Sequence, residues 1–228
     1  MENWETFSEF DKTHYVDTEY AVEGTGSLRV ESVDENTEAT IYQPSLETAN
    51  NDAAAEGRIE TTVRRTDDVY LGIYVRFVDI ENHYFVAGGS FEDPDGRYPE
   101  LNNELRLYRT EGGETEFINA VEFDTFSDRT NIGESEPSWI PFRITWFSDE
   151  MGAFRIWVQE DANEDGEWDD VGGTLVDSSP AFGPNETTTG SGVGFGGNTL
   201  ENPDTLGLSS ENGLWYDQTK LYYDTNAE

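Results

Sequence analysis

The sequence contains no cysteine and only two methionines, Met1 and Met151, among its 228 residues. Disulfides and thiolate metal sites are therefore excluded, and thioether ligands are scarce. No apolar run of roughly 18 residues occurs, so we expect no membrane-spanning helix. The N-terminal residues also lack a basic region followed by an apolar stretch, so we expect no signal peptide.

Lysine is scarce as well, because only Lys12 and Lys220 occur among the 13 basic residues. Asp and Glu number 49, which gives a formal net charge of −36 at pH 7. A chain this acidic repels nucleic acid and anionic membranes, so we expect neither as a partner. Acidic pairs such as Asp67-Asp68 and Asp169-Asp170 are tolerated best where salt shortens the Debye length from about 8 Å to about 3 Å. The composition therefore predicts a halophilic, high-salt source.

The chain nevertheless has the aromatic content of a folded protein, with 13 Phe, 11 Tyr and 6 Trp. Apolar and polar residues alternate with the period of β-strands, most clearly between residues 69 and 77. There, one predicted face holds Val69, Leu71, Ile73, Val75 and Phe77, and the other holds Tyr70, Tyr74 and Arg76. The same alternation occurs within residues 28–31, 58–64, 105–108, 142–146 and 154–158.

Turn residues separate these runs, and no segment has the pattern of an amphipathic helix. No break in composition divides the chain into parts. We therefore predict an all-β fold, a two-sheet antiparallel jelly-roll sandwich that forms one domain over residues 1–228.

Several of the predicted strands follow one another in a recognisable order. They are Gly24–Val30, Asn82–Val86, Leu105–Arg109, Trp139–Trp146, Phe154–Val158, Gly192–Gly196 and Leu221–Asp224. Their order and spacing resemble the concanavalin A-like lectin and glucanase jelly rolls, a group that includes laminin-G-like and carbohydrate-binding modules. The resemblance covers nearly the whole chain. It implies two curved antiparallel sheets, often a structural calcium ion, and frequently glycan recognition on the concave face or the loops.

The acidic motifs of the hydrolases and lyases in this family are incomplete here. Hydrolases need two carboxylates about 5 to 10 Å apart, and the family usually places them on one strand as Glu-x-Asp-x-x-Glu. Glu122-Phe123-Asp124 is the nearest match, but residues 125–127 supply no further acid. Glu104-Leu105-Arg106 and residues 84–88 are similar to two strands of the lyases, but Val86 stands where those lyases have lysine. We therefore expect no enzymatic activity, and keep a glycoside hydrolase or polysaccharide lyase as the less favoured alternative.

The best candidate metal site is the acidic segment between Val158 and Val171. Its oxygen ligands are Asp161, Asn163, Asp165, Glu167 and Asp169. Oxygen ligands at alternate positions around Gly166 suit Ca²⁺ in a tight loop, as in the first half of an EF-hand. The twelfth position is Gly172 rather than a bidentate acid, so the EF-hand interpretation fails, whereas a lectin-type calcium loop needs no such acid. The alternative is a solvated hairpin tip without metal.

Arginines, in contrast to the acids, fall mostly in or beside predicted strands. In one interpretation they face outward and pair with Glu31, Glu60 or Glu104 on neighbouring strands. In the other, six residues line one sheet face, where aromatic rings stack on sugars and guanidinium groups bind hydroxyls or acidic glycans. These candidate glycan-binding residues are Tyr70, Tyr74, Arg76, Arg106, Tyr108 and Trp157.

The predicted absence of a signal peptide favours one setting over another. A halophilic jelly roll that begins at its own methionine fits a virus-particle surface protein, such as a capsid decoration, turret or tail-fibre component. We expect such a protein on the virion surface or outside the cell, in homo-oligomers or in contact with other virion proteins, and able to bind host surface glycans. The alternative is a lectin-like carbohydrate-binding module outside a virus.

Overall fold

The computed structural model describes the strands, the turns that join several of them, and a few further residues. The described residues are 5–7, 13–17, 22, 24, 27–31, 40–43, 56–65, 69–79, 81–89, 104–122, 139–148, 150–161, 165–178, 192–199 and 214–223. Within these ranges the regular structure is entirely β. No helix among them is long and apolar enough to cross a membrane.

The strands form two sheets of seven strands each. Sheet A has the order β1 (Glu5–Phe7), β4 (Thr40–Gln43), β13 (Gly192–Thr199), β6 (Val69–Asp79), β7 (Asn82–Gly89), β8 (Glu104–Glu111) and β9 (Glu114–Glu122). Sheet B has the order β12 (Asp169–Asp177), β11 (Phe154–Glu160), β10 (Ile140–Ser148), β5 (Gly57–Arg65), β14 (Leu214–Tyr223), β3 (Ser27–Glu31) and β2 (Thr13–Asp17).

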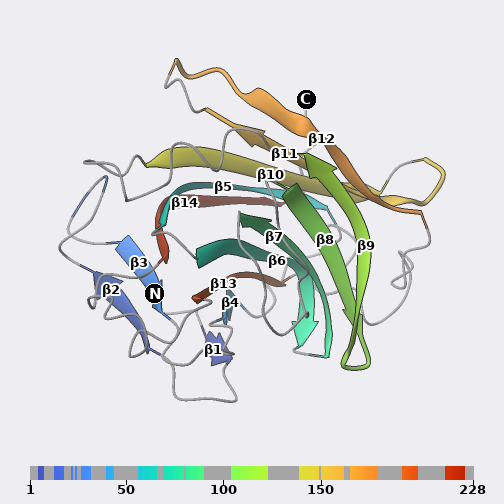
Figure 1. Ribbon diagram of the computed structural model, residues 1–228, viewed down its shortest axis with the longest axis horizontal. Helices are drawn as coiled ribbons and strands as arrows, with labels where there is room; N and C mark the ends of the chain where they lie inside the picture. The colour runs from blue at the N-terminus through green and yellow to red at the C-terminus, as the bar shows by residue number, and fades with distance from the viewer. Residues whose placement is uncertain are drawn as a thin grey trace.

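The two sheets are packed as layers. Sheet B arches over sheet A in Figure 1, and the view from below places β6, β7, β8 and β13 in front of β5, β10 and β14. Neighbouring strands pair antiparallel in the central part of sheet A, which consists of β13, β6, β7 and β8. They also pair antiparallel in sheet B along β12, β11, β10 and β5. This arrangement confirms the predicted two-sheet antiparallel sandwich, whereas its extension as one domain over residues 1–228 stays a prediction.

The core between the sheets follows the alternation in the sequence. On β10, Phe142, Ile144 and Trp146 are buried in the core, while Arg143 lies on the outer face. The other core residues come from β10 itself and from neighbouring strands of both sheets. They are Ile59, Val63, Ile73, Val75, Tyr84, Val86, Leu105, Leu107, Ile140, Phe154, Ile156, Val158, Leu175 and Tyr216. A continuous apolar layer of this kind fixes which side chains remain on the outer faces, where a ligand could bind.

One strand departs from the predicted alternation. In β6, Ile73 and Val75 enter the core as predicted, but the pairing with β7 shifts after Val75, and Arg76 has a positive φ of 49°. This irregularity turns Arg76 toward sheet B. It also places Phe77 on the same face of sheet A as Tyr74. The prediction that Arg76 shares a face with Tyr74 is therefore wrong, because a bulge reverses the alternation at this residue.

Candidate functional site

The outer face of sheet A carries a row of aromatic residues that crosses four strands. Tyr74, Phe85, Tyr108 and Phe117 are aligned by the pairing of β6 to β7, β7 to β8 and β8 to β9. Successive ring centroids are 4.6, 6.3 and 5.8 Å apart. Aromatic pairs at such separations attract one another, so the row ties the four strands together.

This aromatic row is closed to a ligand over most of its length. Tyr74 and Tyr108 are each 2% exposed and Phe85 is 3% exposed, whereas Phe117 is 51% exposed. Arg106 pairs with Glu104 at 2.7 Å and lies over the ring of Phe117, 5.6 Å from its centroid. Burial lowers the pKa of Arg106, but hydrogen bonds with Tyr108 and Glu104 outweigh burial and raise it overall. Because stacking needs an accessible ring, only the end at Phe117 is open to sugar.

The outer face of sheet B presents a second aromatic group, and it is accessible. Trp157 of β11 is half-buried, and its indole Nε1–H donates to Asp170 Oδ1 at 2.8 Å. Its backbone partner in β12 is Thr174, whereas Asp170 is the backbone partner of Gln159. The pairing of β11 with β12 shifts at this point. The hydrogen bond to Asp170 fixes the orientation of the indole.

Two arginines on the same face of sheet B as Trp157 are each stacked on an aromatic ring. Arg143 of β10 lies 4.2 Å from the centroid of Trp168, and Arg58 of β5 lies 4.3 Å from that of Tyr222. Both arginines contact Glu60 Oε1: Arg143 through Nε at 2.9 Å and Nη2 at 2.7 Å, and Arg58 through Nε at 3.4 Å. The Tyr222 hydroxyl donates to Glu60 Oε2 at 3.2 Å.

We call these residues the Trp–Arg surface. Its members are Arg58, Glu60, Arg143, Trp157, Gln159, Trp168, Asp170 and Tyr222. The side chains of Arg58 and Arg143 are each 22% exposed. The two positive charges of the arginines balance the two negative charges of Glu60 and Asp170, although the chain has a net charge of −36. The surface therefore offers planar rings, N–H donors and carboxylate acceptors without the general acidity of the protein.

The structure places the side chains of five of the six predicted glycan-binding residues, and it divides them among three places, which corrects the prediction that they line one sheet face. Tyr74, Arg106 and Tyr108 lie together on the outer face of sheet A. Trp157 lies on the outer face of sheet B, and Arg76 lies between the sheets. Tyr70 is in β6 opposite Asn198, and its side chain is outside the described part.

The predicted pairing of arginines with glutamates on neighbouring strands is confirmed at Glu60, which contacts Arg143 of the adjacent β10, whereas Glu104 pairs with Arg106 of its own strand β8. Glu60 also pairs with Arg58 of its own strand β5. The side chain of Glu31 lies outside the described part. Sequence reasoning did not identify Trp168 and Tyr222 as site residues. Their sequence context gave only a weak signal. Trp168 follows an acidic loop, and Tyr222 lies on a strand that is distant in sequence from the other residues of the surface.

The described part of the acidic segment, Asp161 and residues 165–169, is held together by its own carboxylates. Asp161 is 9% exposed, and its two oxygens each accept a backbone N–H at 3.1 Å, from Asp165 and Gly166. Asp165 Oδ1 accepts the N–H of Glu167 at 2.8 Å. Asn163 lies outside the described residues. Among the residues that the structure describes, no three acidic or histidine side chains converge on a point where a metal ion could bind. Calcium binding here stays a prediction.

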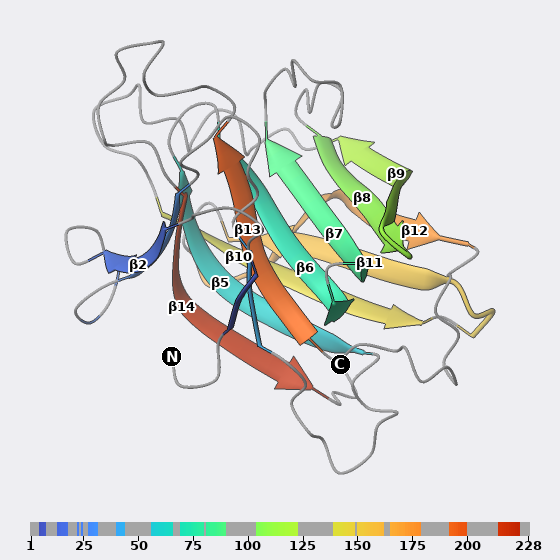
Figure 2. The same ribbon diagram turned by 90° about the horizontal axis from the view of Figure 1, so that it is seen from below.

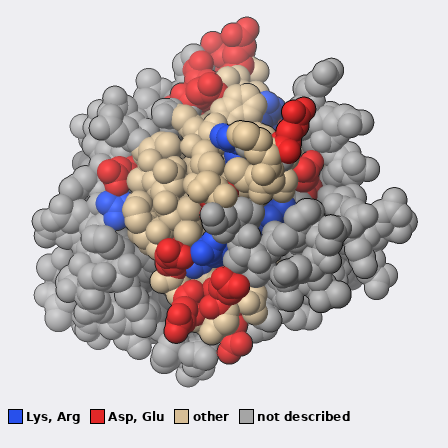
Figure 3. All heavy atoms as spheres, turned by 90° about the vertical axis from the view of Figure 1, so that its right-hand side faces the viewer, with Lys and Arg blue, Asp and Glu red and all other residues tan. Residues whose placement is uncertain are grey.

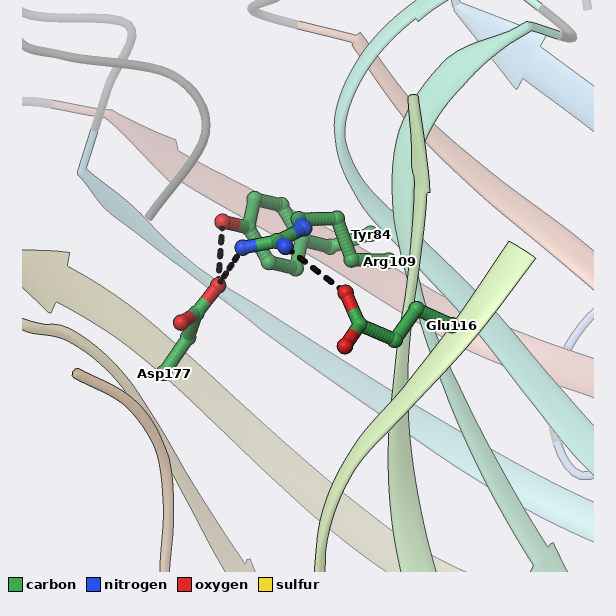
Figure 4. Close-up of polar contacts among 4 residues, drawn as sticks. All are labelled: Tyr84, Arg109, Glu116 and Asp177. Carbon is green, nitrogen blue, oxygen red and sulfur yellow. Dashed lines mark hydrogen bonds and ion pairs between the residues drawn. The ribbon is translucent and has the colours of Figure 1, made fainter. Parts of the chain in front are cut away.

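A buried polar cluster joins the two sheets (Figure 4). Asp177, at the end of β12, accepts hydrogen bonds on Oδ2 from the Tyr84 hydroxyl at 2.9 Å and from Arg109 Nη1 at 2.8 Å. Arg109 also contacts Glu116 at 2.8 Å. Burial lowers the pKa of Arg109, but the charge and hydrogen bond of Asp177 outweigh burial and raise it overall. The cluster therefore connects β7, β8 and β9 to the edge of sheet B.

Arg76 adds a second polar link between the sheets. It is 1% exposed, donates to Ser148 Oγ at 2.9 Å, and lies 4.2 Å from the ring centroid of Phe154. Burial lowers the pKa of Arg76, and the charges of Tyr84 and Glu56 only partly oppose this. Such deep burial makes a direct role in ligand binding impossible, so we assign Arg76 to structure.

The side of the molecule on which β8, β9 and β12 lie is shown in Figure 3. Most of the described area on this side is uncharged, and Asp and Glu side chains gather at its margins. On β9, Glu114, Glu116 and Phe117 are exposed. Phe117 follows the acids in the chain and precedes a run of uncharged residues. Edge strands bearing charged side chains resist pairing with other chains, so we do not assign a partner to this side.

Alkaline pH is expected to destabilise the fold through two core tyrosines. Burial raises the pKa of Tyr84, which Asp177 raises further, and burial raises that of Tyr216 well above its ordinary value. In the unfolded chain both ionise near pH 10. Their contribution to stability is thus complete below about pH 10 and is lost as the pH rises above it. Above that pH, the free energy of unfolding is expected to fall by about 2.7 kcal/mol per pH unit for the two groups together.

Urea denaturation between pH 9 and pH 11.5 measures this slope. In Tyr216→Phe, one of the two groups is absent, so the slope is expected to fall by about half relative to the wild type. A slope that is the same in both proteins would show that other groups cause the alkaline transition.

Comparison with known proteins concerns the fold. No family model matches the sequence, and no curated protein matches it in sequence. The carbohydrate-binding module CBM66 from Bacillus subtilis superposes with a TM-score of 0.50 at 12% identity, over 96% of this chain and 95% of that one. A binding domain of botulinum neurotoxin DC, solved in complex with SialylT, superposes with a TM-score of 0.47 at 13% identity, over 96% of this chain and 43% of that one. The chain therefore shares a β-sandwich architecture with the first of these.

Proposed function

We propose that the protein is a non-enzymatic carbohydrate-binding module, and that the Trp–Arg surface on sheet B is its binding site. The observation that carries this proposal is the accessible indole of Trp157, which Asp170 holds on the same sheet face as two arginines that are themselves stacked on rings. Sugars bind proteins through stacking on an aromatic ring combined with fixed donors and acceptors for hydroxyl groups. The aromatic row of sheet A is a weaker candidate, because three of its four rings are 2 to 3% exposed.

The preorganisation of these side chains supports the proposal. The carboxylate of Glu60 holds Arg143 by two contacts and Arg58 by one, so little side-chain freedom remains to be lost on binding. The fold is also one that a named carbohydrate-binding module uses.

Binding to a panel of insoluble and soluble polysaccharides in 1 M KCl tests the proposal. We expect the wild type to be retained by at least one polysaccharide, and Trp157→Ala to bind it about tenfold more weakly because the stacking surface is removed. Phe117→Ala is the matched control, since it removes an exposed ring from sheet A. We also expect no release of new reducing ends. Retention that is unchanged in Trp157→Ala, or lost equally in Phe117→Ala, would contradict the proposed site.

The virus-particle setting, like the halophilic source, stays a prediction of the sequence. Host attachment would then be the biological use of glycan binding, and the subunit would form symmetric oligomers in molar salt. A lectin-like module outside a virus would use the same surface, but it would not need to form symmetric oligomers.

A further inference from the structure

We infer that the sugar recognised by the Trp–Arg surface is acidic, and that Arg58 and Arg143 bind its carboxylate or sulfate group. This inference rests on the proposed function and names its ligand class. It starts from the charges around Glu60, where positive side chains outnumber the acids that contact them.

Arg58 and Arg143 share a single carboxylate. Both contact the same oxygen of Glu60, and Tyr222 occupies the other oxygen. Lys220 of β14, which is exposed, pairs with Glu60 in register and adds a third positive side chain to this row. Asp170 is two strands away from Arg143, across β11, and accepts from Trp157 and, at 3.5 Å, from Gln159. Two guanidinium groups therefore share one carboxylate, on a protein of net charge −36.

The guanidinium groups retain hydrogen-bonding capacity. Arg143 uses Nε and Nη2 for Glu60, which leaves its Nη1 donors for a ligand, and the ion pair of Arg58 with Glu60 is long, at 3.4 Å from Nε. A guanidinium has five N–H donors in a fixed plane that matches the two oxygens of a carboxylate or sulfate. Both side chains are 22% exposed, so an anion can reach them.

Stacking holds both guanidinium planes in place. Arg143 lies on Trp168 and Arg58 lies on Tyr222, at 4.2 and 4.3 Å from the ring centroids. Charge attraction alone is screened beyond about 3 Å in molar salt. Fixed, charge-assisted hydrogen bonds at contact distance survive such screening, because the partners are desolvated and aligned. An acidic sugar stacked on Trp157 could thus be recognised even in concentrated salt.

Calorimetry in 1 M KCl with matched polysaccharides tests the inference. The probes are polygalacturonate against its fully methyl-esterified form, and dextran sulfate against dextran. We expect the wild type to bind at least one charged polymer at least tenfold more tightly than its uncharged partner. Arg143→Gln is expected to abolish this preference, and Arg143→Lys to restore only part of it because the planar fork is absent. Arg106→Gln, which breaks a matched Arg–Glu pair on sheet A, is expected to leave it unchanged.

Each alternative outcome has a separate meaning. Equal binding of charged and uncharged partners, or a preference that persists in Arg143→Gln, overturns the acidic-sugar inference and leaves carbohydrate binding intact. No binding of any polysaccharide in the wider panel overturns the proposed function as well. If no glycan binds and the wild type self-associates in a manner that Arg143→Gln abolishes, the anion is an acidic side chain of a second copy, and the inference is wrong. Should Arg143→Gln fail to fold, Arg58→Gln provides the same test, with folding checked by circular dichroism.

Discussion

Replacing Asp177 with alanine is expected to lower the free energy of unfolding by about 3 to 5 kcal/mol, because breaking a buried ion pair leaves its partners uncompensated. Two groups lose their acceptor at once, the hydroxyl of Tyr84 and the guanidinium of Arg109. The side chain of Asp177 is 5% exposed, so water cannot replace the lost oxygen without opening the fold. For a chain of this length the melting temperature should fall by roughly 10 °C.

Glu116→Ala is the matched control for this effect. Glu116 and Asp177 each contact Arg109 at 2.8 Å, but the side chain of Glu116 is 65% exposed. Exposed ion pairs contribute at most about 1 kcal/mol, since water and salt compensate the charges. Thermal unfolding of both variants in the same buffer is the measurement. Equal losses of stability would show that burial is not what makes the Asp177 contacts strong.

Removal of salt is expected to have the second large effect. Spread over 11715 Å² of surface, 36 net negative charges lie about 18 Å apart. At this separation one pair repels by about 0.2 kcal/mol in water. Each charge has several neighbours, so the sum is of order 10 kcal/mol, comparable with the roughly 5 to 15 kcal/mol that stabilise a typical domain. Unfolding separates the charges and relieves this repulsion.

The Debye length decides how much of this repulsion acts. It is about 30 Å at 0.01 M salt, which exceeds the spacing of the charges, and about 3 Å at 1 M. We therefore expect a folded protein in 1 M KCl and an unfolded or nearly unfolded one in about 10 mM KCl, measured by far-ultraviolet circular dichroism. Equal stabilisation by KCl and NaCl would identify screening as the cause. A melting temperature that is the same at both salt concentrations would contradict the predicted halophilic adaptation.

The fold was predictable because alternation records burial residue by residue. In β10 and β11, the apolar positions found in the sequence are the ones that enter the core. The bulge in β6 was not predictable, because an arginine has no local preference for the positive φ that Arg76 adopts. A reversal caused by one residue moves all later side chains of the strand to the opposite face.

The binding surface was only partly predictable, for a different reason. Trp157 could be named from its outward position on a strand, but its neighbours depend on strand order. Arg143 and Glu60 are 83 residues apart in sequence and meet only because β10 pairs with β5. Local patterns give the face on which a side chain lies, whereas the pairing of distant strands decides which residues share that face.

The most direct test of carbohydrate binding at the Trp–Arg surface is nuclear magnetic resonance of the six tryptophan indole N–H groups. Trp157→Phe assigns the Trp157 signal, and the wild type is then titrated with fragments of the polysaccharide it retains best, in 1 M KCl. We predict that the Trp157 signal shifts progressively and saturates, while that of Trp146, which is 1% exposed in the core, stays in place. A Trp157 signal that does not move while the fragment demonstrably binds would contradict the proposed site.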